Sequence, residues 1–459
     1  MNTITFPRIE DFRADLSPTE IEEAIAGNVR SIAAQAYIYD MPAFLHLRQL
    51  VDIIQARRHA APTEAPLGGW LLMRNLATPA TRTVTPNNDT LYGASYLLLD
   101  RQGPVVLTVP PIPDHYYSVA MLDADLDTFA IVSPRTFGNS GGTCLITPPG
   151  WTGAVPDGID AMFTAPTPAI ALFQRIFVRN EGDVANVRAL QDAISLAPLN
   201  AAGTAGSAFP HIDLSSFDLP GLHDLRDPLR YFELTNFYTG LNPRPATDIG
   251  LTALFQSAGV GPASTLPDNP RLREAIARGA LDGQEAINAR ISAGPFRRGW
   301  RIPDPGAGRP GTDYLARAAT QTIMFGIFPP EEAIYFLGQR DSNGEQLNGQ
   351  RRYTFTFAPG GLPPLGEYGF WSLTMYDAAQ FLVGNPLNRY SLRPDSPNLT
   401  HGADGSLTIY LQADPPAGVP EGNWLPAPEG DFSVVLRTYL PRTPIRDGSW
   451  FPPGIRLAG

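Results

Sequence analysis

The sequence predicts an α+β fold built from two β-rich domains and added helices. Short apolar runs bounded by turn residues, which are typical of strands, fill residues 90–165 and return after Glu331. Between these regions, Asp227-Pro228 and Asn269-Pro270 each place a helix-capping side chain before a proline. The 43 glycines and 47 prolines are spread along the chain, as expected where tight turns join many short strands. We therefore expect two sandwich- or jelly-roll-like domains, a helical N-terminal arm and a helical middle segment.

The boundaries of these parts follow from the same signals. The arm's helix begins at Ser17-Pro18, and Pro42 is expected to end or kink it. Thr167-Pro168 marks the start of the helical middle region in the same way. The pattern divides the chain into a helical N-terminal arm (1–60), a first β-rich domain (61–165), a mostly helical segment (166–327) and a C-terminal antiparallel β-sandwich domain (328–459).

The composition excludes several mechanisms. All 34 basic residues are arginines, because the sequence contains no lysine. Mechanisms that need a lysine, such as P-loop nucleotide hydrolysis, pyridoxal Schiff-base chemistry and the carriage of biotin, are therefore excluded. Cys144 is the single cysteine, so an intramolecular disulfide and a thiolate zinc site are excluded too.

Partners and compartment are predicted from charge and hydropathy. The formal charge of -11 argues against a nucleic-acid partner. The sequence shows neither a signal-peptide pattern nor an apolar run of membrane-spanning length. We therefore expect a cytoplasmic protein with a small-molecule substrate, no membrane partner and no cofactor; a homo-oligomer is compatible with the sequence.

A dense polar turn, Thr85 to Gly93, is the strongest candidate for a functional segment. It carries Asn87, Asn88, Asp89 and Tyr92 immediately before a strand-like run. Asparagine and aspartate bond their own backbone in turns, and a scaffold strand then holds such side chains rigidly. The segment is interpreted as part of a substrate site, and a well-capped structural turn is the alternative.

Several runs resemble a known two-domain family. The N-terminal runs, which resemble domain of unknown function 1254, are Thr85–Gly93, Gly103-Pro104-Val105-Val106-Leu107 and Tyr116-Tyr117-Ser118-Val119. The C-terminal runs, which resemble domain of unknown function 1214, are Phe370–Asp377, Asn388-Arg389-Tyr390-Ser391, Asp404–Leu407, Asn423–Pro428 and Arg437-Thr438-Tyr439. The resemblance implies two β-rich domains with helical additions, and it implies no settled activity. Where the family pattern has an arginine before the paired tyrosines, this chain has His115.

Three residues are the candidates for proton transfer: Asp89, Tyr92 and His115. The ordinary pKa of histidine suits proton transfer near neutrality, and His115 lies beside the aromatic pair that includes Tyr117, a candidate substrate contact. The alternating carboxylates of Asp123, Asp125 and Asp127 would share one face of a strand, where a divalent cation is one interpretation. A solvated strand end is the alternative.

The C-terminal motif supplies the other wall of the expected site. Its members are aromatic, basic or acidic: Trp371, Tyr376, Asp377, Arg389, Tyr390 and, further along, Trp424. Aromatic rings with an arginine fork and a carboxylate suit a cyclic, partly apolar ligand. A structural ion pair between Asp377 and Arg389 is the alternative.

These observations lead to one functional hypothesis and one alternative. We expect a cofactor-independent enzyme, of the hydrolase, lyase or isomerase type, that uses acid–base chemistry on a small ring-containing substrate. The alternative is a non-catalytic ligand- or carbohydrate-binding protein with an aromatic groove. The site is expected between the two β-rich domains, where Asn87 and Asn88 orient the substrate against the C-terminal motif.

Overall fold

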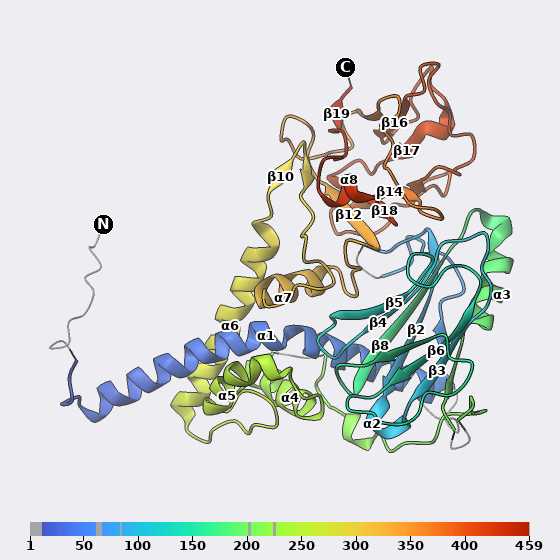
Figure 1. The fold of residues 1–459 in the computed structure, drawn as a ribbon. Helices are drawn as coiled ribbons and strands as arrows, with labels where there is room; N and C mark the ends of the chain where they lie inside the picture. Colours follow the sequence, from blue (N-terminus) through green and yellow to red (C-terminus); the bar gives the residue numbers. More distant parts are fainter. Residues whose placement is uncertain (1–11, 61–66, 83–84, 201–202, 224–225, 459) are drawn as a thin grey trace.

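The computed structural model describes residues 12–60, 67–82, 85–200, 203–223 and 226–458. Within these ranges the chain is α+β, with four mostly antiparallel sheets and a long helical arm, so the predicted class and arm are confirmed. Figure 1 shows the first pair of sheets below the second, with the long arm and the helices packed around it to one side. The expected start of the first β-rich domain, residue 61, lies outside the described residues.

The first pair of sheets shares one apolar core. Leu91, Leu172 and Val119 of one sheet pack with Leu107 and Cys144 of the other. The five-stranded sheet has the order β1 (Leu71–Leu72), β2 (Thr90–Leu98), β8 (Ala169–Phe177), β4 (Tyr117–Leu122) and β5 (Thr128–Val132). The four-stranded sheet has the order β7 (Ala161–Thr164), β6 (Gly142–Thr147), β3 (Val105–Val109) and β9 (Ser195–Pro198).

The second pair of sheets is built in the same way from the C-terminal part. Phe336, Leu373 and Leu436 pack against Phe355 and Ile409 of the facing sheet. The six-stranded sheet has the order β10 (Phe296–Arg297), β11 (Trp300–Arg301), β12 (Ala333–Gly338), β18 (Phe432–Tyr439), β14 (Trp371–Asp377) and β15 (Ser391–Leu392). The other has the order β17 (Trp424–Pro426), β16 (Leu407–Gln412), β13 (Tyr353–Phe357) and β19 (Arg456–Leu457).

The expected boundary at residue 165 is wrong. Residues 169–177 form β8, the central strand of the first sheet, and the Thr167-Pro168 pair precedes this strand rather than a helix. Nearly every residue of β8 is buried, because the strand lies between two neighbours and is covered on both faces. Tertiary burial therefore overrides the helix-start signal. The neighbouring short elements are α2 (Leu99–Gln102) and α3 (Val184–Ala193).

The helical arm is one helix, α1 (Pro18–Ala60), although Pro42 lies inside it. The expected end or break at Pro42 is not found, because the flanking residues Tyr39 and Phe44 are buried in the core. Side chains of other helices also satisfy carbonyls one turn earlier: Tyr231 donates to the Tyr37 carbonyl and Arg317 to the Tyr39 carbonyl. These contacts anchor the turn before Pro42. The carbonyl that lacks its usual donor is that of Ile38, so packing of this turn, rather than a replacement hydrogen bond, keeps the helix continuous.

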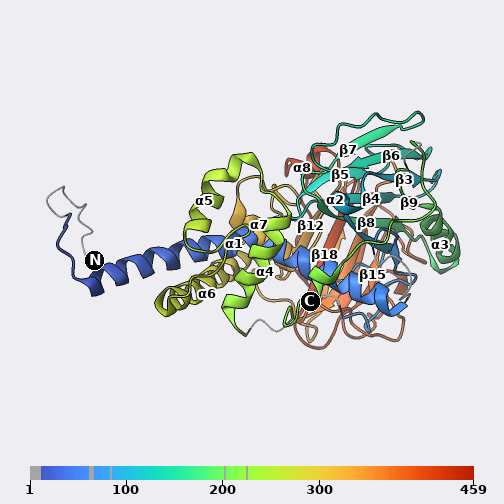
Figure 2. The same ribbon diagram turned by 90° about the horizontal axis from the view of Figure 1, so that it is seen from below.

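Four helices pack around α1, as Figure 2 shows from below: α4 (Pro228–Leu241), α5 (Ile249–Ser257), α6 (Pro270–Ser292) and α7 (Tyr314–Ile323). Asp227 and Asn269 cap α4 and α6 as expected, each accepting a hydrogen bond from the backbone. A last short helix, α8 (Thr443–Arg446), follows β18. In the described part of the chain, no helix is both long and apolar enough to cross a membrane. The cytoplasmic location stays a prediction.

Helices α1 and α6 approach each other through glycine. A Cβ atom on Gly279 would lie 2.4 Å from the Arg30 carbonyl oxygen, and one on Gly283 would lie 2.8 Å from the Ala34 carbonyl oxygen. Both neighbours are backbone atoms, which cannot move aside as a flexible side chain can. A bidentate ion pair between Arg30 and Asp282 borders the contact.

We predict that Gly279→Ala destabilises the protein by about 1–3 kcal/mol, because the added methyl group forces the two helices apart. The matched control is Gly27→Ala in α1, where nothing lies within 4 Å of the added atom. The free energy of unfolding of this control should rise by up to about 1 kcal/mol, because alanine has a higher helix propensity than glycine. Urea unfolding followed by circular dichroism measures both, and equal stabilisation by the two substitutions would contradict the close contact.

Candidate functional site

The polar turn of the first β-rich part docks on the C-terminal part. Asp89 is fully buried, and its carboxylate accepts hydrogen bonds from Ser372 and Ser391, with Arg393 at 3.7 Å. Asn87 uses its side-chain oxygen to accept from the Asp89 amide, and its Nδ2 donates to the Tyr439 hydroxyl at 2.7 Å. The two segments expected to face each other are therefore in contact.

Further contacts fix the turn on β14 and β15. The Tyr376 hydroxyl donates to the Pro86 carbonyl, and the Ser391 hydroxyl, which has one proton, shares it between Asp89 and Asn88 Oδ1, the latter at 2.9 Å. Both oxygens of Asp89 are already occupied, so this carboxylate is placed to hold the junction. Its predicted role in proton transfer has no support from this geometry.

Beside the turn lies a group that we call the arginine–tyrosine cluster, defined as Tyr92, Arg175, Tyr335, Arg437 and Tyr439. The sheets position its members: Tyr92 is paired with Arg175 across β2 and β8, and Tyr335 with Arg437 across β12 and β18. The Arg175 guanidinium lies 5.1 Å from the Tyr92 ring centroid and hydrogen-bonds the Tyr335 hydroxyl. The two β-rich parts thus contribute to one cluster.

Both arginines of the cluster are buried without an acidic partner in hydrogen-bond contact. Arg175 is 7% exposed; it donates to Tyr335 and to the Gly326 carbonyl, and its Nε has no partner. Arg437 is 3% exposed and donates to Thr374, to Tyr376 and to the Thr85 carbonyl. In the described ranges, neither guanidinium forms an ion pair with a carboxylate.

The phenol groups of Tyr335 and Tyr439 lie in surroundings of low polarity. Burial raises the pKa of the Tyr335 and Tyr439 phenols, although the nearby arginine charges oppose this shift. Tyr439 stacks on Phe370 with ring centroids 4.3 Å apart and contacts Tyr116 at 5.0 Å. These three rings, Tyr116, Phe370 and Tyr439, form what we call the aromatic wall.

His115 and Tyr117 lie away from the cluster. His115 Nε2 is 2.9 Å from an Asp183 carboxylate oxygen, and both side chains are buried. Burial alone would raise the pKa of the Asp183 carboxyl. Hydrogen bonds from the Arg179 amide and from His115 outweigh this effect and lower the pKa to about 2. Tyr117 faces the core of the first pair of sheets and donates to the Gly138 carbonyl. The positions of these two residues favour structural roles.

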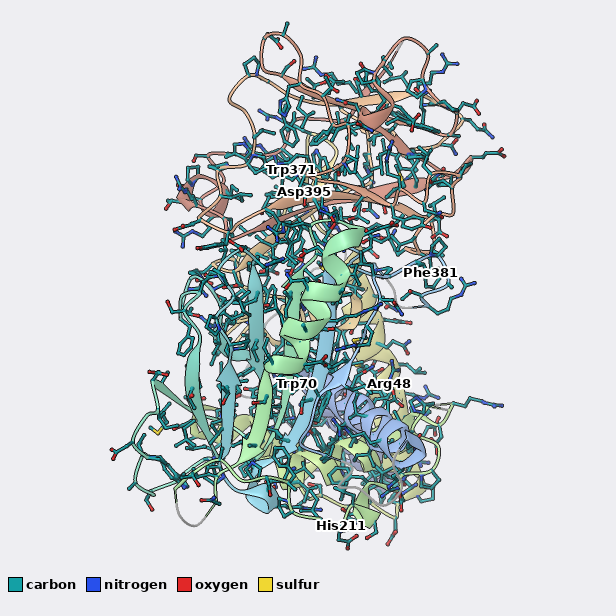
Figure 3. The ribbon with its side chains drawn as sticks, turned by 90° about the vertical axis from the view of Figure 1, so that its right-hand side faces the viewer. Arg48, Trp70, His211, Trp371, Phe381 and Asp395 are labelled. Carbon is teal, nitrogen blue, oxygen red and sulfur yellow. The ribbon has the colours of Figure 1, made fainter. Side chains whose placement is uncertain are left out.

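The C-terminal candidates are divided between different surroundings. Trp371 packs on Phe357 inside the C-terminal core, and Figure 3 shows it within the upper part of the molecule. Trp424 is buried and donates to the Gln412 carbonyl. Only Tyr376 and its neighbour Tyr390 lie on the junction side of the sheet.

Asp377 and Arg389 do not form the ion pair considered as an alternative. Asp377 accepts from the Phe381 amide at 2.9 Å and closes the turn after β14. Arg389 donates to the carbonyls of Glu421 and Trp424. Each residue therefore organises a loop.

The three alternating aspartates lie in the turn between β4 and β5, so their expected arrangement on one strand face is wrong. Asp123 accepts from the amides of Asp125 and Asp127, and Leu126 has a φ of 62°, which breaks the alternation. Asp125 pairs with the Arg244 guanidinium. In the part of the chain that the structure describes, no three His, Cys, Asp or Glu side chains are grouped as metal ligands.

Sequence reasoning missed Arg175, Tyr335 and the role of Arg437. A usable signal was present, because an arginine inside an otherwise apolar strand run, as in residues 169–177 and 432–439, is unusual and needs a partner. The run Arg437-Thr438-Tyr439 was noticed only as part of the family pattern. Its alternation places Arg437 and Tyr439 on the same face of β18, toward the junction.

Comparison with known proteins identifies the family. Residues 70–198 match the model of a protein of unknown function (DUF1254), and residues 332–443 match the model of a protein of unknown function (DUF1214). The chain therefore belongs to the family that carries these two domains in this order, as its sequence motifs indicated. No curated protein matches the sequence.

Two solved structures are similar. The VPA0106 protein from Vibrio parahaemolyticus is 24% identical, with a TM-score of 0.68, over 94% of this chain and 100% of that one. This similarity shows the fold alone. A putative uncharacterized protein from Burkholderia cenocepacia is 11% identical over 96% of each chain, and its TM-score of 0.43 is too low to support an argument.

We predict that Asp89→Asn destabilises the protein by roughly 1.5–3 kcal/mol, because it removes the charge from a buried carboxylate that accepts hydrogen bonds from Ser372 and Ser391 of the C-terminal part. The matched control is Asp114→Asn, an exposed aspartate of the same part. Thermal unfolding measures both variants. An unchanged midpoint for Asp89→Asn would show that the junction does not depend on this charge.

We predict that stability falls as the pH rises from about 4 to about 8, the interval between the ordinary pKa of aspartate and that of folded Asp123. Burial, with the neighbouring charges of Asp125 and Asp127, raises the pKa of Asp123 to about 8. The folded protein therefore holds a proton there that the unfolded chain releases. Asp123→Asn keeps the acceptor oxygen but cannot titrate. The urea unfolding midpoint of this variant should therefore fall less between pH 4 and pH 8 than that of the unsubstituted protein.

The control for this pH series is Asp157→Asn, an exposed aspartate outside the turn. Its pH dependence should follow that of the unsubstituted protein. Parallel curves for Asp123→Asn and the unsubstituted protein would contradict the assignment.

Proposed function

We propose that the arginine–tyrosine cluster binds the carboxylate of a small, ring-containing organic acid, and that the protein is a cofactor-independent acid–base enzyme acting on it. One observation carries this proposal: two buried guanidinium groups at the junction have no ion-pair partner among the described residues. Arginine stays protonated under all physiological conditions, so the charges cannot be removed by titration. A bound anion would compensate them.

The physical argument concerns the cost of burying charge. An unpaired ion inside a protein costs several kcal/mol. Elsewhere in the chain a buried guanidinium is compensated by carboxylates: Arg244 pairs with both Asp40 and Asp125. Arg175 has only neutral partners and ring contacts with Tyr92 and Phe328, which repay part of the cost.

A count of charges around the junction supports a monoanionic ligand. The guanidinium groups of Arg175, Arg393 and Arg437 lie there with the carboxylates of Asp89 and Asp395. Three positive charges against two negative ones leave one positive charge in excess. One carboxylate would balance it, and arginine forks bind carboxylates with two parallel hydrogen bonds.

The surrounding rings favour a cyclic, partly apolar ligand. The centroid of the Phe328 ring lies 3.9 Å from the guanidinium carbon of Arg175. Tyr92 and Tyr335 are half-buried at the edge of the cluster. Flat aromatic walls with a few polar groups are typical of sites for small organic molecules. The interpretation of each β-rich part as a sandwich, based on the core shared by its two sheets, would make both walls rigid.

Tyr92 is the residue that we assign to proton transfer. Among Asp89, His115 and Tyr92, only Tyr92 belongs to the cluster, and it is also the only one with part of its surface exposed. Asp89 and His115 would act as positioning residues. The absence of lysine leaves phenol, carboxylate and imidazole groups for such chemistry.

The alternative, a non-catalytic binding protein, uses the same contacts. The deep burial of Arg437 and Tyr439 favours it, because a ligand held there would exchange slowly. The sugar-stacking form of this alternative has less support, since Trp371 and Trp424 are both buried in structural positions.

We predict that small ring-containing carboxylic acids raise the thermal unfolding midpoint, whereas amines of the same shape do not. Arg175→Gln should weaken acid binding by roughly tenfold to a hundredfold, the equivalent of a lost charged hydrogen bond. The acid affinity of Arg175→Lys, which keeps the charge but lacks the guanidinium fork, should lie between that of the unsubstituted protein and that of Arg175→Gln. Thermal shift over a panel of acids and isothermal titration measure these effects.

Two further variants complete the test. Arg351→Gln, at an exposed arginine away from the junction, should bind acids normally. Tyr92→Phe keeps the ring and should retain binding but lose product formation, as followed by mass spectrometry. Equal stabilisation by amines, or unchanged acid affinity in Arg175→Gln, would overturn the proposal; binding without turnover by the unsubstituted protein would favour the non-catalytic alternative.

A further inference from the structure

A recess, which we call the junction groove, lies across the aromatic wall from the arginine–tyrosine cluster. This junction groove has a volume of about 540 Å³, which is enough for a small organic molecule. Its charged and aromatic lining consists of Arg135, Glu331, Glu367, Tyr368, Arg442 and Arg446. Arg135 follows β5, Glu331 precedes β12, and the arginines 442 and 446 follow β18, so both β-rich parts build the groove.

The groove is separate from the arginine–tyrosine cluster. Tyr439 ends β18 in the cluster, and the next residue, Leu440, already lines the groove. Beneath the groove, the fully buried Glu332 accepts from the Tyr116 hydroxyl and from Arg135 Nε at 3.0 Å. The packed rings of the aromatic wall therefore stand between the two places.

The charges that line the groove are not satisfied by one another. Arg442 makes no side-chain hydrogen bond or ion pair in the described structure, and Arg446 donates only to Thr443. Glu331 and Glu367 likewise form no ion pair with any described residue, and Glu331 Oε2 is buried without a partner. Opposite charges thus share one recess but stay more than ion-pair distance apart.

A ligand with one charge would leave half of this lining unused. A carboxylate alone would bind the arginines and would be repelled by Glu331 and Glu367. An ammonium group alone would meet the reverse problem. A molecule that carries both charges on neighbouring atoms complements both sets, because each end finds its opposite.

We propose that the junction groove binds a zwitterionic small molecule of the free amino-acid type. Its carboxylate binds Arg442 and Arg446, and its ammonium group donates to the Glu331 carboxylate where that side chain lines the groove. Tyr368, which is exposed at the edge, packs against its side chain. Because the groove is lined by both β-rich parts, binding holds them together.

The test uses a panel of free amino acids, with phenylalanine, phenylpropionate and phenethylamine as the matched set. Isothermal titration and thermal shift are run on the full-length Arg175→Gln variant, in which the arginine–tyrosine cluster no longer competes for acids, and all further substitutions are made in this background. They should detect binding of at least one amino acid. For a phenylalanine-type binder, the analogues that lack the ammonium or the carboxylate group should bind about tenfold more weakly or worse, the equivalent of about 1.4 kcal/mol for each lost charge.

Variants then assign each end of the ligand. Arg442→Gln should weaken amino-acid binding but not binding of the amine analogue, which loses a repelling charge. Glu331→Gln should weaken amino-acid binding but not binding of the acid analogue, for the same reason. Arg351→Gln is the control for loss of an exposed arginine. Both test positions lie at the surface of the groove, so folding is checked by an unchanged circular dichroism spectrum.

Three results would overturn the proposal. The first is no binding by any amino acid at millimolar concentration. The second is an acid analogue that binds as well as its amino acid, which would make the groove a simple anion site. The third is binding that survives both Arg442→Gln and Glu331→Gln.

Discussion

The buried carboxylate of Asp89 is the group on which the junction of the two β-rich parts depends. A carboxylate loses several kcal/mol of hydration when it is buried, and it stays charged inside only where donors replace the water. Here the donors Ser372 and Ser391 come from β14 and β15 of the other part, and Arg393 adds a positive charge. The polar turn can therefore be buried only when the C-terminal sheet is in place.

Buried positive charges have different partners in different places of the molecule. Arg244 lies between Asp40 of α1 and Asp125 of the β4–β5 turn, so it ties the helical arm to the first sheet. Arg393 is shared between Asp89 and Asp395. Arg175 and Arg437 have neutral partners, and this difference within one molecule is the basis on which we propose an anion site there.

The aromatic wall gives the junction two faces with separate chemistry. On one side, buried arginines with tyrosines complement a single negative charge. On the other side, the open junction groove offers both signs of charge without pairing them. Tyr116 connects the two faces, since its ring packs on Tyr439 and its hydroxyl donates to Glu332, which in turn holds Arg135. A ligand bound on either side would thus affect the same contacts between the two β-rich parts.

The sequence by itself determined the class, the helical arm and the family, because these follow from local signals. Capping residues before prolines place α4 and α6, alternation places β13 and β16, and long polar or aromatic runs mark the two domains. It also picked out Asn87, Asp89 and Tyr376, since such polar and aromatic density stands out within a strand-forming region.

Only the tertiary structure decided which of these residues meet and which are free to act. Pro42 stays inside α1 because its neighbours are buried and contacts from other helices anchor the preceding turn. Residues 169–177 form the central strand because both of their faces are covered. Trp371 and Tyr376 lie close in sequence, yet strand alternation sends Trp371 into the core and Tyr376 to the junction. Arg175 and Arg437 are 262 positions apart in the printed sequence, and their common surroundings arise from the packing of two sheets, which no local pattern encodes.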